Sequence, residues 1–166
     1  MMAKRKAGKE FQDTTDYTLQ MIGKAALFLY WVFDNIVILS TVKILIVKDQ
    51  KLYSKLGMFF WWVQLVVTNA NTIIKLKQLS VEAGEIKKSI RENPSMDNPA
   101  RDKLKALPKK RKELILTLIK LHGDMLPASQ GWGLPELLVG KPISEGACGV
   151  GGFISAAITV YSVYNS

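Results

Sequence analysis

The sequence predicts an all-α integral membrane protein, built from an antiparallel hairpin of transmembrane helices, an amphipathic helix, and a C-terminal transmembrane helix rich in small residues. Three observations lead to this prediction. Almost half of the 166 residues are apolar (48%), they are gathered into long blocks, and the excess basic residues behind the net charge of +9 lie between those blocks. Such alternation is typical of a protein embedded in an anionic membrane.

We expect four regions along the chain. Residues 1–18 are a basic N-terminal tail and residues 19–79 a two-helix membrane hairpin. Residues 80–112 belong to a basic connector, and residues 113–166 contain the amphipathic helix, a loop rich in glycine and proline, and the last transmembrane helix.

The hairpin is predicted from two apolar blocks. Residues 25–42 contain Asp34 as their only charge, whereas residues 56–74 contain none and form the cleaner span. A carboxylate inside the bilayer costs about 3 kcal/mol, so Asp34 needs a partner or a proton. With a polar turn at residues 48–55, centred near residue 51, Asp34 would meet Thr68 and Asn69. We interpret this contact as a packing and register device, with proton or solute passage as the alternative.

The basic connector follows the hairpin. Residues 75–112 hold twelve Lys or Arg against five acidic residues. A polar helix over residues 81–91 is compatible with this composition, whereas Asn93-Pro94 and Asn98-Pro99 predict turns. We expect a solvated segment attracted to anionic head groups. Its end supplies the predicted head-group contacts, which are Lys109, Lys110, Arg111 and Lys112. Nucleic-acid binding would require interleaved aromatic side chains, and residues 76–112 contain none, so we predict no nucleic-acid partner.

The next stretch, residues 113–126, has the spacing of an amphipathic helix. It is too short to span a bilayer comfortably, so we expect it to lie in the interface or to pack on the hairpin. Pro127 is predicted to end this helix, and the glycines and prolines up to Glu145 predict a loop of turns.

The C-terminal block is the strongest membrane signature. Residues 146–166 carry no charged side chain, and about twenty residues at about 1.5 Å rise each span the hydrocarbon core. Small residues recur at every fourth position, which lets another helix approach closely. The predicted helix-packing residues are Ala147, Gly151, Ser155 and Thr159.

No catalytic constellation is visible in the sequence. There is no serine with a nearby histidine, no pair of carboxylates on a shared face, no zinc-ligand spacing and no phosphate-binding loop. His122 and the single cysteine, Cys148, are interpreted as packing residues. We therefore predict a protein that is not an enzyme and binds no metal or cofactor.

The order of three motifs resembles the C-terminal half of the peroxin-11 family over about 140 residues. The first is Leu-Tyr-Trp-Val-Phe-Asp-Asn-Ile-Val at residues 29–37. The second is Lys-Glu-Leu-Ile-Leu at 112–116 followed by Asp-Met-Leu-Pro at 124–127. The third is Gly-Phe-Ile-Ser-Ala-Ala-Ile-Thr-Val-Tyr at 152–161.

The resemblance implies a helical membrane protein of peroxisomes that helps to elongate and divide the organelle, self-associates and binds fission machinery. Family members usually carry a further N-terminal region with amphipathic helices, whereas this sequence starts just before its Asp-Asn helix. The resemblance thus implies the embedded scaffold more directly than membrane remodelling. The alternative is an accessory structural subunit of a large membrane complex, such as a respiratory or ATP synthase assembly of the mitochondrial inner membrane. Under either hypothesis the partners are lipids and other membrane helices.

Overall fold

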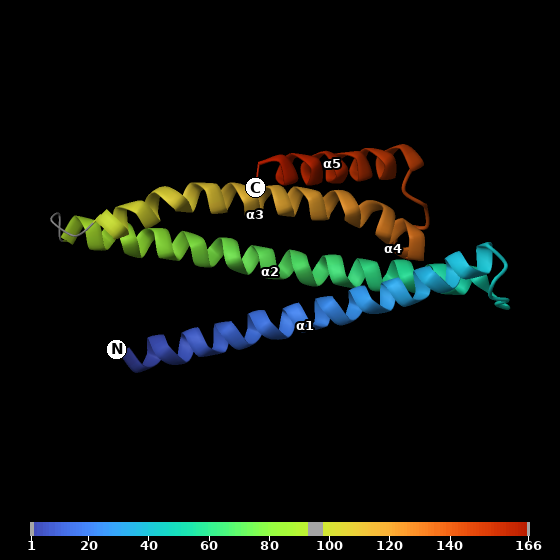
Figure 1. Ribbon diagram of the computed structural model, residues 1–166, viewed down its shortest axis with the longest axis horizontal. Coiled ribbons are helices and arrows are strands. Elements are labelled where there is room, and N and C mark those ends of the chain that lie inside the picture. Colours follow the sequence, from blue (N-terminus) through green and yellow to red (C-terminus); the bar gives the residue numbers. More distant parts are fainter. Residues whose placement is uncertain (1, 93–97, 166) are drawn as a thin grey trace.

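The computed structural model describes residues 2–92 and 98–165, with the side chains of residues 14–92 and 100–165. The chain is all-helical in this part (Figure 1). The helices are α1 (Met2–Thr41), α2 (Gln50–Glu92), α3 (Asn98–Trp132), α4 (Leu134–Val139) and α5 (Glu145–Tyr164). The predicted N-terminal tail, residues 1–18, is therefore helical from Met2 onwards and continues into the first apolar block.

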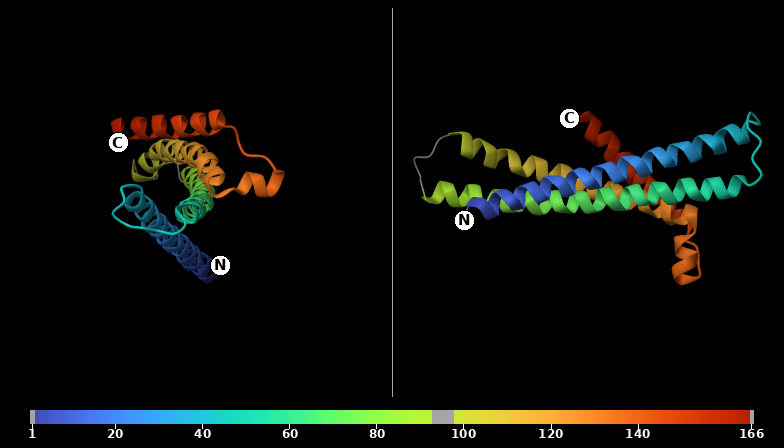
Figure 2. Two further views of the ribbon diagram at one scale, coloured as in Figure 1. Left: turned by 90° about the vertical axis from the view of Figure 1, so that its right-hand side faces the viewer. Right: turned by 90° about the horizontal axis from the view of Figure 1, so that it is seen from below.

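The long helices form an open array, in which α1 packs on α2, α2 on α3, and α3 on α5. Each helix runs antiparallel to the one before it in this order (Figure 1). Among the described helices, α1 makes no contact with α3 or α5, and α2 makes none with α5. Seen from its end, the array is an arc rather than a closed bundle (Figure 2). Both faces of the array therefore remain open to the surroundings.

The turn between α1 and α2 occupies residues 42–49, so the prediction of a turn at residues 48–55 is wrong. α1 ends in a Schellman motif, in which Ile44 N–H bonds the carbonyl of Leu39 and Lys43 N–H bonds that of Ser40. Lys43 has the left-handed backbone (φ 60°) that this motif requires. Asp49 then caps α2, because its Oδ1 accepts the N–H of Leu52 at 3.0 Å. A cap at Asp49 starts α2 inside the segment that was expected to be a turn.

Replacing Asp49 by alanine is expected to lower the free energy of unfolding by about 1 kcal/mol, because the Leu52 N–H loses its acceptor. Thermal unfolding in detergent measures the change. Asp49→Asn is the matched control, since an asparagine oxygen can still accept this hydrogen bond. Equal stability of the alanine variant and the wild type would show that the cap is not formed.

Most of the basic connector is helical rather than a solvated loop, and the polar helix expected at residues 81–91 lies within α2. α2 extends to Glu92 and α3 starts at Asn98, so most of residues 75–112 are helical. The predicted turn at Asn93-Pro94 lies outside the described residues, and the turn predicted at Asn98-Pro99 is instead the start of α3. The many Lys, Glu and Arg side chains of this segment are good helix formers, which explains how a strongly charged stretch prolongs both helices.

Pro127 does not end the amphipathic helix, because α3 continues through it to Trp132. The predicted loop after Pro127 is also largely helical, since α4 follows at Leu134–Val139. Gly133 (φ 90°) and Gly140 (φ 70°) flank α4 with the left-handed backbone that turns the chain at both ends. Gln130 holds this element in place: its Oε1 accepts the N–H of Ile143 at 2.7 Å.

The small core lies between α2 and α3. Leu65, Leu121 and Ala128 are buried there, and partly buried side chains pack around them, namely Trp61, Trp62 and Met125. Aromatic rings extend this packing towards the α1–α2 turn, where Tyr30 stacks on Trp61 and Phe59 meets Trp132 edge-on. Packing of this kind fixes α2 against both neighbours, while most other apolar side chains stay exposed.

Candidate functional site

Two of the described helices are long and apolar enough to cross a membrane, α5 and the part of α1 at Thr14–Thr41. Their most apolar stretches have mean hydropathies of 1.5 and 1.6, and only 11% of each stretch is buried. Residues 56–74, predicted as the cleaner span, lie in α2, which is not one of these two helices. Gln64, Asn69 and Asn71 explain this result, because their amides offset the aliphatic side chains around them.

Asp34 does not meet Thr68 and Asn69, so the predicted pairing is wrong. The backbone nitrogen of Asp34 lies against Gly57, 3.9 Å from where a Cβ atom of that glycine would be. Thr68 lies opposite Gly23, with its Oγ1 3.9 Å from the corresponding position. The register follows from the turn at residues 42–49, which is centred about five residues earlier than expected.

Asn69 faces α3 instead of α1. It is buried, and its Nδ2 lies 3.5 Å from Nδ1 of His122 and 3.6 Å from Sδ of Met125. His122 Nδ1 also contacts the carbonyl of Leu118 at 2.7 Å. At 2.7 Å from a carbonyl oxygen, Nδ1 of His122 carries the proton and donates to Leu118, so it is not an acceptor for the Asn69 amide. The Asn69 side chain therefore packs against His122 and Met125 across the α2–α3 interface.

Two members of the predicted small-residue stripe, Gly151 and Ser155, are buried against α3. The partner is Gly123: a Cβ atom on Gly151 would lie 2.6 Å from the carbonyl oxygen of Gly123, and one on Gly123 would lie 2.5 Å from that of Gly151. Ala147 is half-buried and Thr159 is exposed, at the two ends of the same stripe. The stripe therefore faces a helix of its own chain.

Gly123 was not singled out in the sequence, although it lies on the apolar face of residues 113–126. Pro127 gives a reason for its position. A proline has no N–H, so the carbonyl of Gly123 lacks its usual helical donor four residues later. That carbonyl instead points at Gly151, where a weak Cα–H···O contact is available. In the sequence, the proline four residues after Gly123 was the feature that could have indicated a free backbone carbonyl at this position.

The predicted head-group residues Lys109, Lys110, Arg111 and Lys112 are all exposed on α3. Lys112 also reaches across to α5: its Nζ donates to the hydroxyl of Tyr161 at 2.7 Å and lies 5.1 Å from the centre of that ring. The structure thus divides the cluster into one lysine that contacts α5 and three side chains directed into solvent.

Two further apolar surfaces were missed by the sequence analysis, the α1–α2 turn and α4. Their aliphatic side chains are among the most exposed of the chain: Ile44 (74%), Ile46 (95%), Leu137 (75%), Leu138 (73%) and Val139 (74%). Among the side chains that the structure describes, no three His, Cys, Asp or Glu residues gather closely enough to hold a metal ion. The most prominent functional surface is therefore apolar.

An open array of helices with exposed apolar faces, two of them able to span a bilayer, defines the class of helical membrane proteins. The family described as peroxisomal biogenesis factor 11 (PEX11) matches residues 2–164, so the chain belongs to this family. The resemblance noted in the sequence is thereby confirmed. Neither the family match nor the relative described next supports the mitochondrial alternative.

A relative from Dictyostelium discoideum, named peroxisomal membrane protein 11 homolog, is 27% identical over 161 residues. The match covers 88% of this chain and 61% of the relative, so the chain spans less than two thirds of that protein's length. No solved structure matches the chain.

Proposed function

We propose that the chain is a non-catalytic structural protein that organises or shapes the peroxisomal membrane during elongation and division of the organelle. The family match over residues 2–164 carries this proposal, and membership of the family makes the chain a peroxisomal membrane protein. The role in elongation and division of the organelle goes beyond family membership and is the proposal for this chain.

The open array supports a scaffold role. α1 and α2 form the proposed membrane hairpin, α5 is the proposed C-terminal span, and the amphipathic residues 113–126 lie within α3 between α2 and α5. Because every face of the arc keeps apolar side chains exposed, lipids or other membrane helices have to cover them. The proposed partners are therefore lipids, further copies of the chain, or subunits of a larger complex.

The exposed basic residues on α3 support contact with anionic head groups. Lys109, Lys110 and Arg111 are directed into solvent, and each basic residue near an anionic surface contributes about 1 kcal/mol. Lys112 belongs to the same proposed contact, although it is also held by Tyr161.

The test reconstitutes the purified full chain into liposomes that contain anionic lipid and follows their shape by cryo-electron microscopy. We expect elongated or tubular liposomes with the wild type, and longer, more numerous peroxisomes when the chain is overproduced in cells. A variant with Lys109, Lys110 and Arg111 changed to glutamine should act more weakly, because it keeps the Lys112 contact to α5 but loses three charges. Correctly inserted wild-type protein that changes neither liposomes nor peroxisomes would rule out the shaping role.

A further inference from the structure

The two candidate spans lie at opposite edges of the array, and they are not level along its axis. The first apolar block, residues 25–42, lies in α1 up to Thr41 and has its middle at residues 33 and 34, beside Gly57 of α2. The next residue of α2, Met58, contacts Gly131 of α3: a Cβ atom on Gly131 would lie 2.5 Å from Cγ of Met58. The middle of the first span is therefore level with Gly131.

The middle of α5 is level with another part of α3. It falls between residues 154 and 155, and the backbone nitrogen of Ser155 lies 3.5 Å from where a Cβ atom of Gly123 would be. Gly123 and Gly131 are eight residues apart on one helix, which corresponds to about 12 Å at a rise of about 1.5 Å per residue. If the helices stood upright, the two spans would occupy depths about 12 Å apart in a core roughly 30 Å thick.

A tilt within the plane of the array removes this mismatch. Three interhelical steps of roughly 8–10 Å each separate α1 from α5 along the arc, so the straight distance between its two edges is at most about 25 Å. An offset of about 12 Å over this distance corresponds to a tilt of at least about 25°, which is within the usual range for membrane helices. We propose that the apolar surface forms a belt oblique to the helix axes. The helices of the array are then tilted by at least about 25° in the bilayer, which brings the middles of the two spans to the same depth. This inference rests on the proposed membrane-embedded function.

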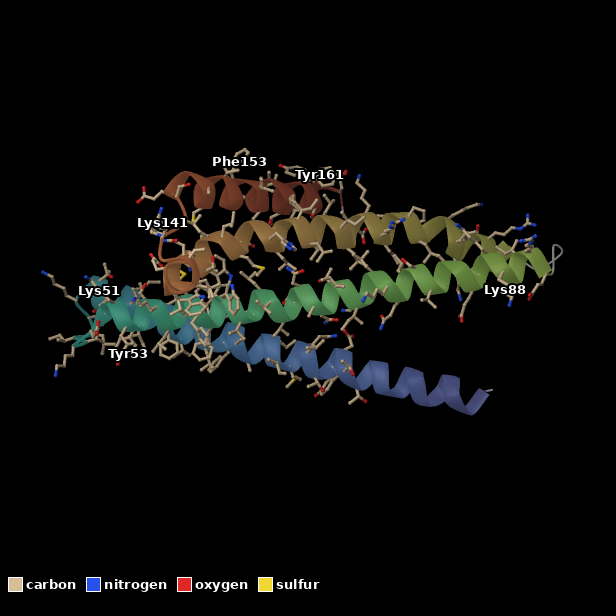
Figure 3. The ribbon with its side chains drawn as sticks, turned by 180° about the vertical axis from the view of Figure 1, so that it is seen from behind. Lys51, Tyr53, Lys88, Lys141, Phe153 and Tyr161 are labelled. Carbon is tan, nitrogen blue, oxygen red and sulfur yellow. The ribbon has the colours of Figure 1, made fainter. Side chains whose placement is uncertain are left out.

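Charged residues mark both edges of the oblique belt. On one edge lie Lys43 after α1, Lys51 near the start of α2, Lys141 after α4, and Glu145 at the start of α5. Lys51 and Lys141 lie at the same end of the molecule, and Lys88 lies at the other (Figure 3). On the opposite edge lie Lys24, Lys75 and Lys112. Lys112 contacts Tyr161, and a lysine paired with a tyrosine is typical of a membrane–water interface.

The belt also explains the exposed apolar turn and α4. The tilt moves the level of α4 towards that of the α1–α2 turn, so that both approach one interface. α4 runs across the long axis of the other helices and points out of the plane of the array (Figure 2). Since this direction is the axis of the tilt, α4 stays parallel to the membrane surface. Leu137, Leu138 and Val139, all more than 70% exposed, would then lie in the lipid of that leaflet.

Four charges lie within the belt. Lys55, two residues before Gly57 on α2, is exposed, and its long side chain can extend the ammonium group towards the interface, whereas the other three are partly buried. Asp34 on α1, and Lys120 and Asp124 one turn apart on α3, are all half-buried. Partial burial inside the array is consistent with the belt, because it keeps these groups from facing lipid directly.

Spin-label depth measurements test the tilt. The only native cysteine is removed by Cys148→Ser, and single cysteines are introduced in the full chain by Val32→Cys, Ile154→Cys or Gly146→Cys. Each labelled protein is reconstituted into vesicles, and accessibility to oxygen and to a nickel chelate gives the depth. All three sites suit a label: Val32 (36%) and Ile154 (39%) are partly exposed, and Gly146 has open space around it.

The oblique belt predicts that labels at Val32 and Ile154 share one depth near the bilayer centre, with Gly146 about 12 Å shallower. An upright array predicts that Val32 and Gly146 share a depth instead, and this outcome would overturn the inference while leaving membrane embedding intact. Exposure of all three labels to the nickel chelate would contradict the proposed function itself. Labels at Phe28 (64% exposed) and Val160 (57%) form a second pair that the tilt places level, and they replace any variant that fails to fold.

Discussion

Replacing Gly151 by leucine is expected to release α5 from α3. Even the Cβ atom of the new side chain would lie 2.6 Å from the carbonyl oxygen of Gly123 and 2.9 Å from Cδ1 of Leu126. The oxygen belongs to the backbone of α3 and cannot move aside, so the helices have to separate. Overpacking of this kind costs roughly 1–3 kcal/mol, and each 1.4 kcal/mol is about a tenfold change in an equilibrium.

Cross-linking between α3 and α5 measures this release. Cysteines replace Ile119 and Ile154, which line the same groove between the two helices, in a chain that also carries Cys148→Ser. With a short bismaleimide we expect the cross-linking yield of Gly151→Leu to fall by about tenfold. Gly149→Leu is the matched control, because nothing lies within 4 Å of a Cβ atom at Gly149.

The alanine pair sharpens the comparison. Gly149→Ala should be neutral or stabilising, because alanine favours a helix over glycine by about 1 kcal/mol, whereas Gly151→Ala should already weaken docking. Equal cross-linking of the wild type and Gly151→Leu, with unchanged helicity, would show that α5 does not dock on α3 through these glycines.

The contrast with Gly131 shows that the kind of atom a new Cβ atom would meet matters more than its distance from that atom. A Cβ atom on Gly131 would lie 2.5 Å from Cγ of Met58, as close as the contact at Gly123. The atom in the way at Gly131 belongs to a flexible side chain, however, and methionine adapts readily to a change of space. Close backbone contact therefore distinguishes the α3–α5 crossing from the α2–α3 crossing.

The helical class and the apolar blocks could be predicted from the sequence because they depend on composition over about twenty residues. The register could not, because it depends on where one turn falls. In an antiparallel hairpin, each residue by which the turn shifts changes the residue opposite a given position by two. The cap at Asp49, directly before α2, places the turn centre about five residues earlier than expected, and the residue opposite Asp34 is Gly57 instead of Thr68.

The same reasoning explains the error at Pro127. A proline removes one backbone donor and usually ends a helix in water. Within α3 the missing bond is tolerated, because the freed carbonyl of Gly123 faces the backbone of α5 at Gly151. Sequence position alone did not reveal this compensation, since the partner helix lies about thirty residues further along the chain.

The small-residue stripe was predicted to be a face for close packing against another helix, whose identity the sequence left open. The structure supplies Gly123 of the same chain. This assignment changes the meaning of the Gly151 experiment: detachment of α5 is expected inside one molecule, before any effect on self-association or on a larger complex.

Replacing Leu65 by alanine is expected to lower the free energy of unfolding by about 2–5 kcal/mol. Leu65 is 2% exposed and packs with Leu121 and Ala128, which is completely buried, so truncation leaves a cavity between α2 and α3. In detergent or lipid the loss lies mainly in packing contacts, because no water is excluded from such an interface. Unfolding in mixed micelles, followed by tryptophan fluorescence, reports the change through Trp61 and Trp62 beside Leu65.

Leu52→Ala is the matched control, since it makes the same change in the same helix at a side chain that is 51% exposed. Its effect should stay within about 0.5 kcal/mol. The comparison matters because α2–α3 is the middle contact of the described array: α1 is joined to the rest only through α2, and α5 only through α3. A loosened core would thus separate one proposed span from the other and abolish their common level in the bilayer. Equal effects of the two leucine substitutions would mean that α2 and α3 are held together elsewhere than at Leu65.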